Sequence, residues 1–155
     1  MRSIIIYQST AHSNTEKIAK VLSKAFNCDM VKPHQVDIKS LHKYDLIGFG
    51  SGIYFNKYHK SILQFLSGLP KFNNKNAFIF STSGMREFPI FHKFNRKITE
   101  MLLDKGFKIL GKLNLRGYDN YGFLKLIGGI NKGRPNNKDF KKAEDFANYI
   151  KNIMV

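Results

Sequence analysis

Residues 3–15 read Ser-Ile-Ile-Ile-Tyr-Gln-Ser-Thr-Ala-His-Ser-Asn-Thr. This stretch predicts a buried strand that runs directly into a polar loop. Ser3–Tyr7 is continuously apolar and rich in β-branched residues, which is typical of a strand covered on both faces. Beyond the loop, apolar residues recur at helical spacing, at Ile18, Val21, Leu22, Ala25 and Phe26. The polar loop is therefore expected between the carboxyl end of a strand and the amino end of a helix.

The composition of this loop favours binding of an anion. Hydrogen-bond donors are carried by Ser9, Thr10, His12, Ser13, Asn14 and Thr15. No acidic residue precedes Glu16, and the positive end of the helix dipole attracts negative charge. The loop is thus expected to cradle a phosphate. The alternative is that Asn14 or Thr15 simply caps the helix, which needs only one such residue.

Two more predicted strands end in small residues. Leu46–Gly50 predicts a buried strand that precedes Ser51–Phe55, and Ala77–Ser81 predicts another that precedes Thr82–Gly84. In a doubly wound parallel sheet the carboxyl ends of such strands share one edge, where ligands bind. An aromatic residue at this edge can stack on a flat ring, and we expect Tyr54 in that role, with Phe55 as alternate. Ordinary packing of both rings is the other possibility.

The remaining elements complete an alternating pattern of strands and helices. Strands are expected at Asp29–Lys32 and Phe107–Leu115, and helices at Tyr58–Ser67 and Pro89–Lys105. A last helix is expected after a cap at Asn136 or Asn137. The segment Gly117–Pro135 is long for a connection and predicts a functional loop. We expect one domain over residues 1–155.

The pattern Tyr7-x-Ser-Thr-x-x-Ser-Asn-Thr15 resembles the FMN-phosphate loop of the flavodoxin family. The family's usual form ends in Gly-Asn-Thr, so Ser13 stands in place of a glycine, and the loop is one residue longer. Serine takes a positive φ less readily than glycine. The order and spacing of the five strands also agree with the family over almost the whole chain. The segment Gly128–Asn136 is similar to that of small flavodoxin-domain proteins of anaerobes.

The resemblance implies an α/β, flavodoxin-like three-layer fold with a five-stranded parallel sheet in the order 2-1-3-4-5. It also implies non-covalently bound FMN as the cofactor. The residues that would bind FMN are Ser9, Thr10, Ala11, His12, Ser13, Asn14 and Thr15 in the first loop, Ser51, Gly52, Ile53, Tyr54 and Phe55 in the second, and Thr82, Ser83 and Gly84 in the third.

The function implied by the resemblance is electron transfer through FMN to a redox partner protein. No acid–base pair is evident, so we predict no catalytic residue and favour a carrier over an enzyme. The alternative is a small FMN-dependent oxidoreductase, similar to protoporphyrinogen oxidases or quinone reductases, in which Gly117–Pro135 would shape the substrate site. The sequence leaves this choice, and the oligomeric state, open.

Charge and cysteine content limit the other functions. The net charge of +15 suits an acidic redox partner, but the basic residues are dispersed, which disfavours nucleic-acid binding. Cys28 is the single cysteine and is expected to be a packing residue, and no His/Cys spacing predicts a metal site.

A leader and a long apolar span are absent, so we expect a cytoplasmic protein. A phosphorylated receiver domain is strongly disfavoured, because Gln8-Ser9 and Gly50-Ser51 occupy the positions of its acids.

Overall fold

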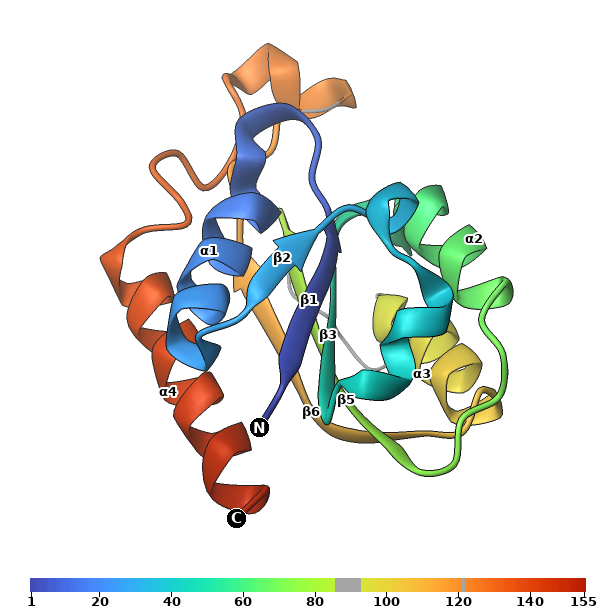
Figure 1. Ribbon diagram of the computed structural model, residues 1–155. Helices are drawn as coiled ribbons and strands as arrows, with labels where there is room; N and C mark the ends of the chain where they lie inside the picture. Colours follow the sequence, from blue (N-terminus) through green and yellow to red (C-terminus); the bar gives the residue numbers. More distant parts are fainter. Residues whose placement is uncertain (86–92, 121) are drawn as a thin grey trace.

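Five parallel strands form the sheet, in the order β2-β1-β3-β5-β6. This computed structural model describes residues 1–85, 93–120 and 122–155 (Figure 1). The parallel strands are β1 (Ser3–Gln8), β2 (Asp29–Val31), β3 (Leu46–Tyr54), β5 (Lys75–Ser83) and β6 (Phe107–Arg116). The predicted fold class is confirmed. The labels shift because a short sixth strand, β4 (Lys57–Tyr58), which was not predicted, pairs antiparallel with the end of β3.

Helices cover both faces of the sheet (Figure 1). One face carries α1 (Asn14–Phe26) and α4 (Asn137–Ile153), and the other carries α2 (Lys60–Ser67) and α3 (Phe94–Asp104). Short 3₁₀ segments complete the chain, namely η1 (Ala11–Ser13), η2 (Pro33–Gln35), η3 (Ile38–Lys43) and η4 (Gly122–Ile127). Among the helices within the described ranges, none is both long and apolar enough to cross a membrane.

Several element boundaries differ from the sequence-based expectation. The strands β3 and β5 continue to Tyr54 and Ser83, so the small residues expected in loops are still hydrogen-bonded in the sheet. The helix α2 begins at Lys60 because Tyr58 pairs with Ile53 in β4. Pro89, the expected start of the next helix, lies outside the described residues, and α3 begins at Phe94.

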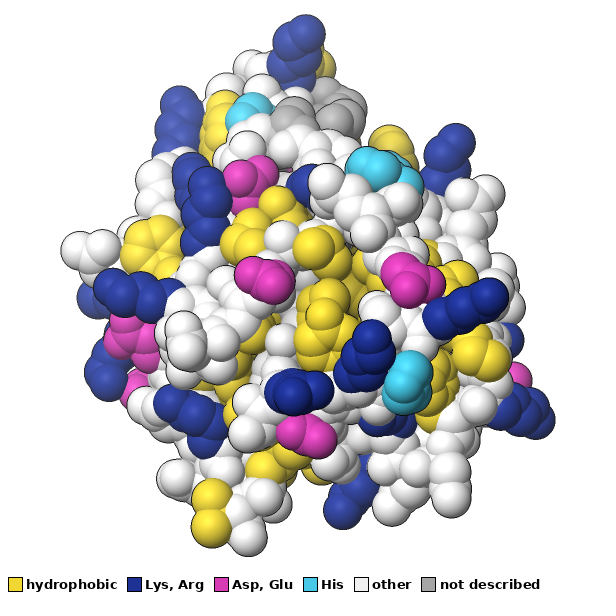
Figure 2. All heavy atoms as spheres, viewed as in Figure 1, with side chains coloured by type: hydrophobic (Ala, Val, Ile, Leu, Met, Phe, Trp, Pro, Cys, Tyr) yellow, Lys and Arg dark blue, Asp and Glu magenta, His cyan; other side chains and the backbone are white. Residues whose placement is uncertain are grey.

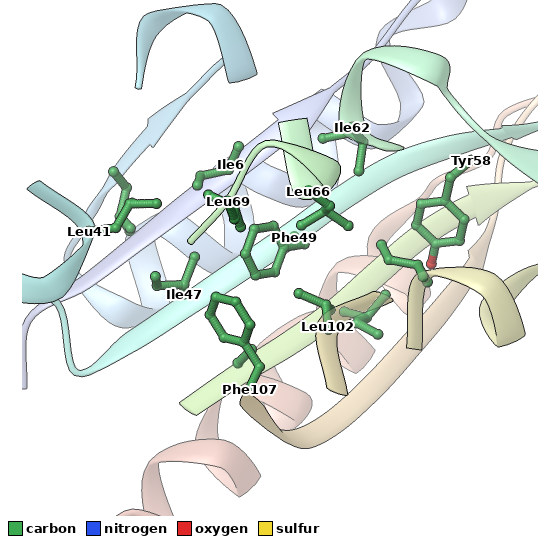
Figure 3. Close-up of a cluster of buried hydrophobic side chains, with 14 of the residues drawn as sticks. Ile6, Leu41, Ile47, Phe49, Tyr58, Ile62, Leu66, Leu69, Leu102 and Phe107 are labelled. Carbon is green, nitrogen blue, oxygen red and sulfur yellow. The ribbon is translucent and has the colours of Figure 1, made fainter. Parts of the chain in front are cut away.

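Strand alternation divides the core into two layers. Ile4 and Ile6 face α2 and α3, whereas Ile5 and Tyr7 face α1 and α4. Figure 3 shows the first layer, where the rings of Phe49 and Phe107 meet edge to face with centroids 5.5 Å apart. Two-sided burial explains why the strands read as continuous apolar runs.

Two glycines of β3 make room for two phenylalanines of β5. Gly48 pairs with Phe78 and Gly50 pairs with Phe80 in the parallel register. A Cβ on either glycine would collide with the ring of its partner. These glycines are therefore needed for packing between the strands, because the aromatic rings of β5 fill the space that side chains on β3 would otherwise occupy.

The amino end of α4 is fixed by a buried ion pair. The Arg134 guanidinium donates two hydrogen bonds to the carboxylate of Asp139, whose side chain is fully buried. The same carboxylate accepts the Asn136 N–H at 2.9 Å, and the Asn136 side chain caps the helix as predicted. Burial alone would raise the pKa of Asp139, but hydrogen bonds from Arg134 and Asn136 hold it below its ordinary value.

Asp139→Asn should therefore lower the free energy of unfolding at neutral pH by about 2 kcal/mol, since it leaves Arg134 without its anion. A lowered folded-state pKa means that this stabilisation is complete above the unfolded pKa of about 3.9 and is lost as pH falls through the folded value. Urea unfolding across the acidic range measures both effects. Asp145→Asn, which breaks an exposed pair with Lys141, is the control and should change stability by less than about 0.5 kcal/mol. Equal losses in the two variants would contradict the assignment.

Candidate functional site

Two adjoining cavities open at the carboxyl edge of the sheet. The polar cavity, with about 390 Å³ of empty space, is lined by the loop after β1, the ends of β3 and β5, and Gly117, Tyr118 and Asp119. The apolar cavity, with about 940 Å³, is lined by Phe55, Met85, Phe94, Phe123, Leu124 and their neighbours. The two share Ile53, Tyr54, Ser83, Gly84 and Asp119. Together they form one cleft with a polar end and an apolar end.

The loop after β1 takes a left-handed turn without glycine. His12 has φ +70° and Ser13 has φ +50°, and the Ser13 N–H donates to the Thr10 carbonyl at 3.1 Å. A left-handed conformation costs a residue with a Cβ about 1 kcal/mol. Ser13 thus adopts the backbone conformation for which glycine is usually selected, and the loop keeps the glycine-type turn.

No side chain caps α1. Ser13 occupies the cap position and makes no capping hydrogen bond, so the alternative of simple capping by Asn14 or Thr15 is wrong. The Asn14 amide instead donates to the Tyr118 carbonyl at 2.9 Å. The buried Thr15 hydroxyl instead bonds the Thr82 hydroxyl at 2.8 Å. The first-turn N–H groups of α1 are consequently left for a ligand or solvent.

Several polar atoms at the polar cavity have no protein partner. Within the described part of the chain, no hydrogen bond to protein is formed by the hydroxyl of Ser9, which lines this cavity, or by that of Ser13, which is exposed in the adjoining loop. The Asn14 Oδ1 atom is buried and also lacks a partner. A buried unpaired acceptor is unfavourable by about 1–3 kcal/mol, so this oxygen favours a ligand that brings a donor such as a hydroxyl.

Other polar groups at the same edge serve the protein itself. The Tyr54 hydroxyl contacts the Thr10 hydroxyl at 2.5 Å, which ties the end of β3 to the first loop. Ser51 is fully buried, donating to the Gly52 carbonyl at 2.6 Å and accepting the His59 N–H at 2.9 Å. The hydroxyls therefore fall into two groups, one that holds the edge together and one that faces the cleft.

Most of the predicted binding residues line the cleft. Those lining one or both cavities are Ser9, His12, Asn14, Thr15, Gly52, Ile53, Tyr54, Phe55, Thr82, Ser83 and Gly84. Thr10 and Ser13 lie in the first loop without lining either cavity, Ala11 begins η1, and Ser51 is buried within β3. The structure thus brings the three predicted loops to one place.

The connection after β6, which the sequence predicted as a functional loop, contributes individual residues that were not among the predicted FMN-binding residues. The rings of His12 and Tyr118 meet edge to face with centroids 4.6 Å apart, and His12 Nε2 lies 2.9 Å from Asn120 Oδ1. Asn131 Nδ2 donates to the carbonyls of Gly84 and Gly117 at 2.7 and 3.2 Å. The sequence offered one clue to these residues. Gly117 follows the fifth predicted parallel strand, and parallel strands end at the same edge of the sheet as the three predicted loops.

The pKa values of His59, beside the cleft, and Cys28, at the opposite edge of the sheet, are both shifted. Burial, then the charge of Lys60, lowers the pKa of His59, which keeps the ring neutral so that Nδ1 can accept the Ser61 N–H at 3.2 Å. Burial raises the pKa of the Cys28 thiol to about 11, and Cys28 packs on the α1 and α4 layer as predicted. In the described ranges no cluster of His, Cys, Asp and Glu could hold a metal ion.

Residues 4–125 match the protein family described as Flavodoxin domain. An uncharacterized protein of Methanocaldococcus jannaschii is 48% identical over 151 residues, which cover 97% of this chain and 98% of that protein.

Solved structures share the fold at low sequence identity. A flavodoxin from the domain Archaea has a TM-score of 0.71 and 15% identity over the full length of both chains. Flavodoxin 2 of Bacillus cereus has a TM-score of 0.73 and 18% identity over 99% of each chain. The rubredoxin oxygen:oxidoreductase of Desulfovibrio gigas has a TM-score of 0.71 and 18% identity, with 98% of this chain covering 35% of that one.

Removing both hydroxyls of the Thr15–Thr82 pair should destabilise the protein by less than the sum of the two single removals. Thr15→Val or Thr82→Val alone leaves a buried hydroxyl unpaired, and each should lower the unfolding free energy by about 1–2 kcal/mol. The double variant should lose less than the sum of the single variants. A double-mutant cycle by chemical denaturation measures this coupling, and strict additivity would show that the contact contributes nothing.

Proposed function

Because the chain belongs to the flavodoxin-domain family, we propose that it is a cytoplasmic electron carrier that binds FMN non-covalently and passes electrons to a partner protein. The observation that carries this proposal is the buried, unpaired Asn14 Oδ1 beside the uncapped α1, in a cleft whose other end is apolar. FMN combines the matching groups, since it has a phosphate, a chain of hydroxyls and a flat aromatic ring.

The polar cavity suits the phosphate and the hydroxyl chain. The first-turn N–H groups of α1 and the hydroxyls of Ser9 and Ser13 would hold the phosphate, because helix amino ends and hydroxyl donors favour anions. Asn14 Oδ1 would accept a hydrogen bond from a ribityl hydroxyl. Residues 8–15 contain no carboxylate that would repel the phosphate.

The apolar cavity suits the flavin ring. Tyr54 lines both cavities, and its hydroxyl is fixed on Thr10, so its ring would border the flavin. Phe55 has φ +47°, Asn56 has φ +62°, and the Phe55 side chain is 86% exposed. A tight turn of this kind prefers Asn-Gly, so neither turn geometry nor packing accounts for an exposed phenylalanine. We therefore assign Phe55 as an aromatic cover for the ring.

Bound FMN would supply the group that accepts and donates electrons, and the protein would supply position and shielding. Ile53, Phe94 and Leu124 exclude water from the ring end of the cleft. Asp119 lines both cavities and packs against Gly84, where a Cβ would collide with its carboxylate. Its negative charge would oppose the addition of an electron to the ring and so would influence the reduction potential.

The purified protein should bind FMN, as seen in shifted visible bands that survive desalting, and should bind FMN at least about tenfold more tightly than riboflavin because of the phosphate contacts. Asn14→Leu should weaken FMN binding by about tenfold, the loss expected for one hydrogen bond. Asn152→Leu, at an exposed position on α4, is the control. A well-folded protein that retains no FMN would contradict the proposal.

A second candidate is a small FMN-dependent oxidoreductase that acts on an apolar substrate, such as a quinone. It is favoured by the larger volume of the apolar cavity, about 940 Å³ against about 390 Å³, and by its walls of Phe94, Phe123 and Leu124. Those walls extend beyond the three loops that would hold FMN.

Reduction of a soluble naphthoquinone by the FMN-loaded protein, whose flavin is first reduced with light and EDTA so that it supplies the two electrons, separates the two candidates. For a carrier we expect the rate of the FMN-loaded protein to rise linearly with quinone concentration, because no substrate complex forms. Saturation, together with a raised KM in Leu124→Ser and an unchanged KM in the exposed control Leu103→Ser, would favour the enzyme instead.

A further inference from the structure

Exposed apolar side chains collect at the mouth of the apolar cavity. Phe55 is 86% exposed, Phe123 76%, Leu126 89% and Ile127 66%. Phe55 and Phe123 line the same cavity, and three of the four residues belong to η4. A group of large exposed apolar side chains beside a cleft marks an interaction surface, because isolated ones are ordinary but grouped ones are not.

The segment that presents these side chains is held by hydrogen bonds. The Gly128 N–H donates to the Lys125 carbonyl at 3.2 Å, and the Gly129 N–H donates to the Leu124 carbonyl at 2.7 Å. The Tyr118 hydroxyl donates to the Gly128 carbonyl at 3.2 Å, which ties η4 to the wall of the polar cavity. The apolar residues are thus displayed by a fixed turn.

Lysines surround the exposed apolar group. Lys57 belongs to β4 next to the Phe55 turn, and Lys125 belongs to η4. Lys132 places its ammonium beside Gly128, 3.2 Å from where a Cβ would be. None of the three forms an ion pair with a carboxylate of the described residues. Figure 2 shows basic and apolar side chains together at the end of the molecule that carries η4, at the top.

We propose that Phe55, Phe123, Leu126 and Ile127, together with Lys57, Lys125 and Lys132, form the docking surface for an acidic electron-transfer protein. This inference rests on the proposed function, because a partner must approach the cofactor closely to exchange electrons with it. The net charge of +15 would attract an acidic partner over a distance, and the lysines at the cleft would orient it. The apolar residues would then exclude water from the contact.

Two other occupants fit this surface less well. A second copy of the chain carries the same net charge of +15 and would be repelled. The amphipathic helices that lie in membrane interfaces present a continuous apolar face, whereas η4 has only six residues and the fourth apolar side chain, Phe55, comes from a separate turn.

The test uses the full chain loaded with FMN and a reduced, acidic two-iron ferredoxin as the probe. Lys125→Glu/Lys132→Glu and Leu126→Ser/Ile127→Ser remove the charges and the apolar side chains without changing residues that line either cavity. Matched controls at the opposite edge of the sheet are Lys43→Glu/Lys108→Glu and Leu103→Ser/Ile153→Ser, all exposed. Stopped-flow absorbance gives the second-order rate constant for flavin reduction.

We expect the lysine pair at the docking surface to slow reduction by about tenfold at about 0.05 M salt and to have little effect at about 0.5 M, because salt screens the attraction. The apolar pair should slow it at both salt concentrations. The control lysine pair, which lowers the net charge equally, should slow reduction much less, and the control apolar pair should react like the wild type. Dithionite should reduce every variant at the same rate.

Equal slowing by the two lysine pairs would overturn the proposal, since net charge alone would then explain the rate. The proposal would also be overturned if the docking-surface variants kept normal ferredoxin kinetics but lost binding to anionic phospholipid vesicles. The same holds if they kept normal ferredoxin kinetics but lost the ability to dimerise. If the protein retains no FMN, the proposed function fails first. Calorimetric titration with oxidised ferredoxin then tests the surface by itself, and equal affinities for all variants would overturn the docking surface.

Discussion

Neighbouring strands β1 and β3 send the chain to opposite faces of the sheet, and the candidate site depends on this divergence. The chain leaves β1 toward α1 on one face and leaves β3 toward β4 and α2 on the other. The two described connections leave on opposite sides, so a crevice remains between them. Parallel direction then requires β5 and β6 to end at the same edge, which brings Thr82 and Gly117 to the crevice.

The buried polar groups at this edge include groups that are paired within the protein and an acceptor that is not. Thr15, Thr82 and Ser51 are buried and satisfied by protein, as buried polar groups in native structures usually are. Asn14 Oδ1 is buried but unsatisfied. Since the same side chain donates its amide to Tyr118, Asn14 is held in place with its acceptor uncommitted. Such a group is unfavourable in the free protein and becomes favourable when a ligand donates to it.

Local patterns in the sequence predicted the strands and the three loops but could not predict contacts between distant residues. The apolar run at Ser3–Tyr7 identified β1, because two-sided burial leaves a local pattern. The extension of β3 to Tyr54 was missed, because Gly50 and Gly52 are typical of a turn. In the structure both lie within the strand, and Gly50 makes room for the ring of Phe80. Capping by Thr15 was wrong because its hydroxyl bonds Thr82, a residue with no local relation to it.

The connection after β6 joins the two functions proposed for the cleft. Its first residues, including Tyr118, complete the polar cavity, and η4 displays apolar side chains to solvent at the cavity mouth. Its end is fixed to α4 through Arg134 and Asp139, and its middle is fixed to Gly84 through Asn131. Hydrogen bonds thus anchor the connection to the sheet edge and to α4. Under the proposed function, a partner bound to η4 would lie beside the cavity assigned to the flavin. The contact surface would then govern the rate of encounter, and the ends of the strands would position the cofactor.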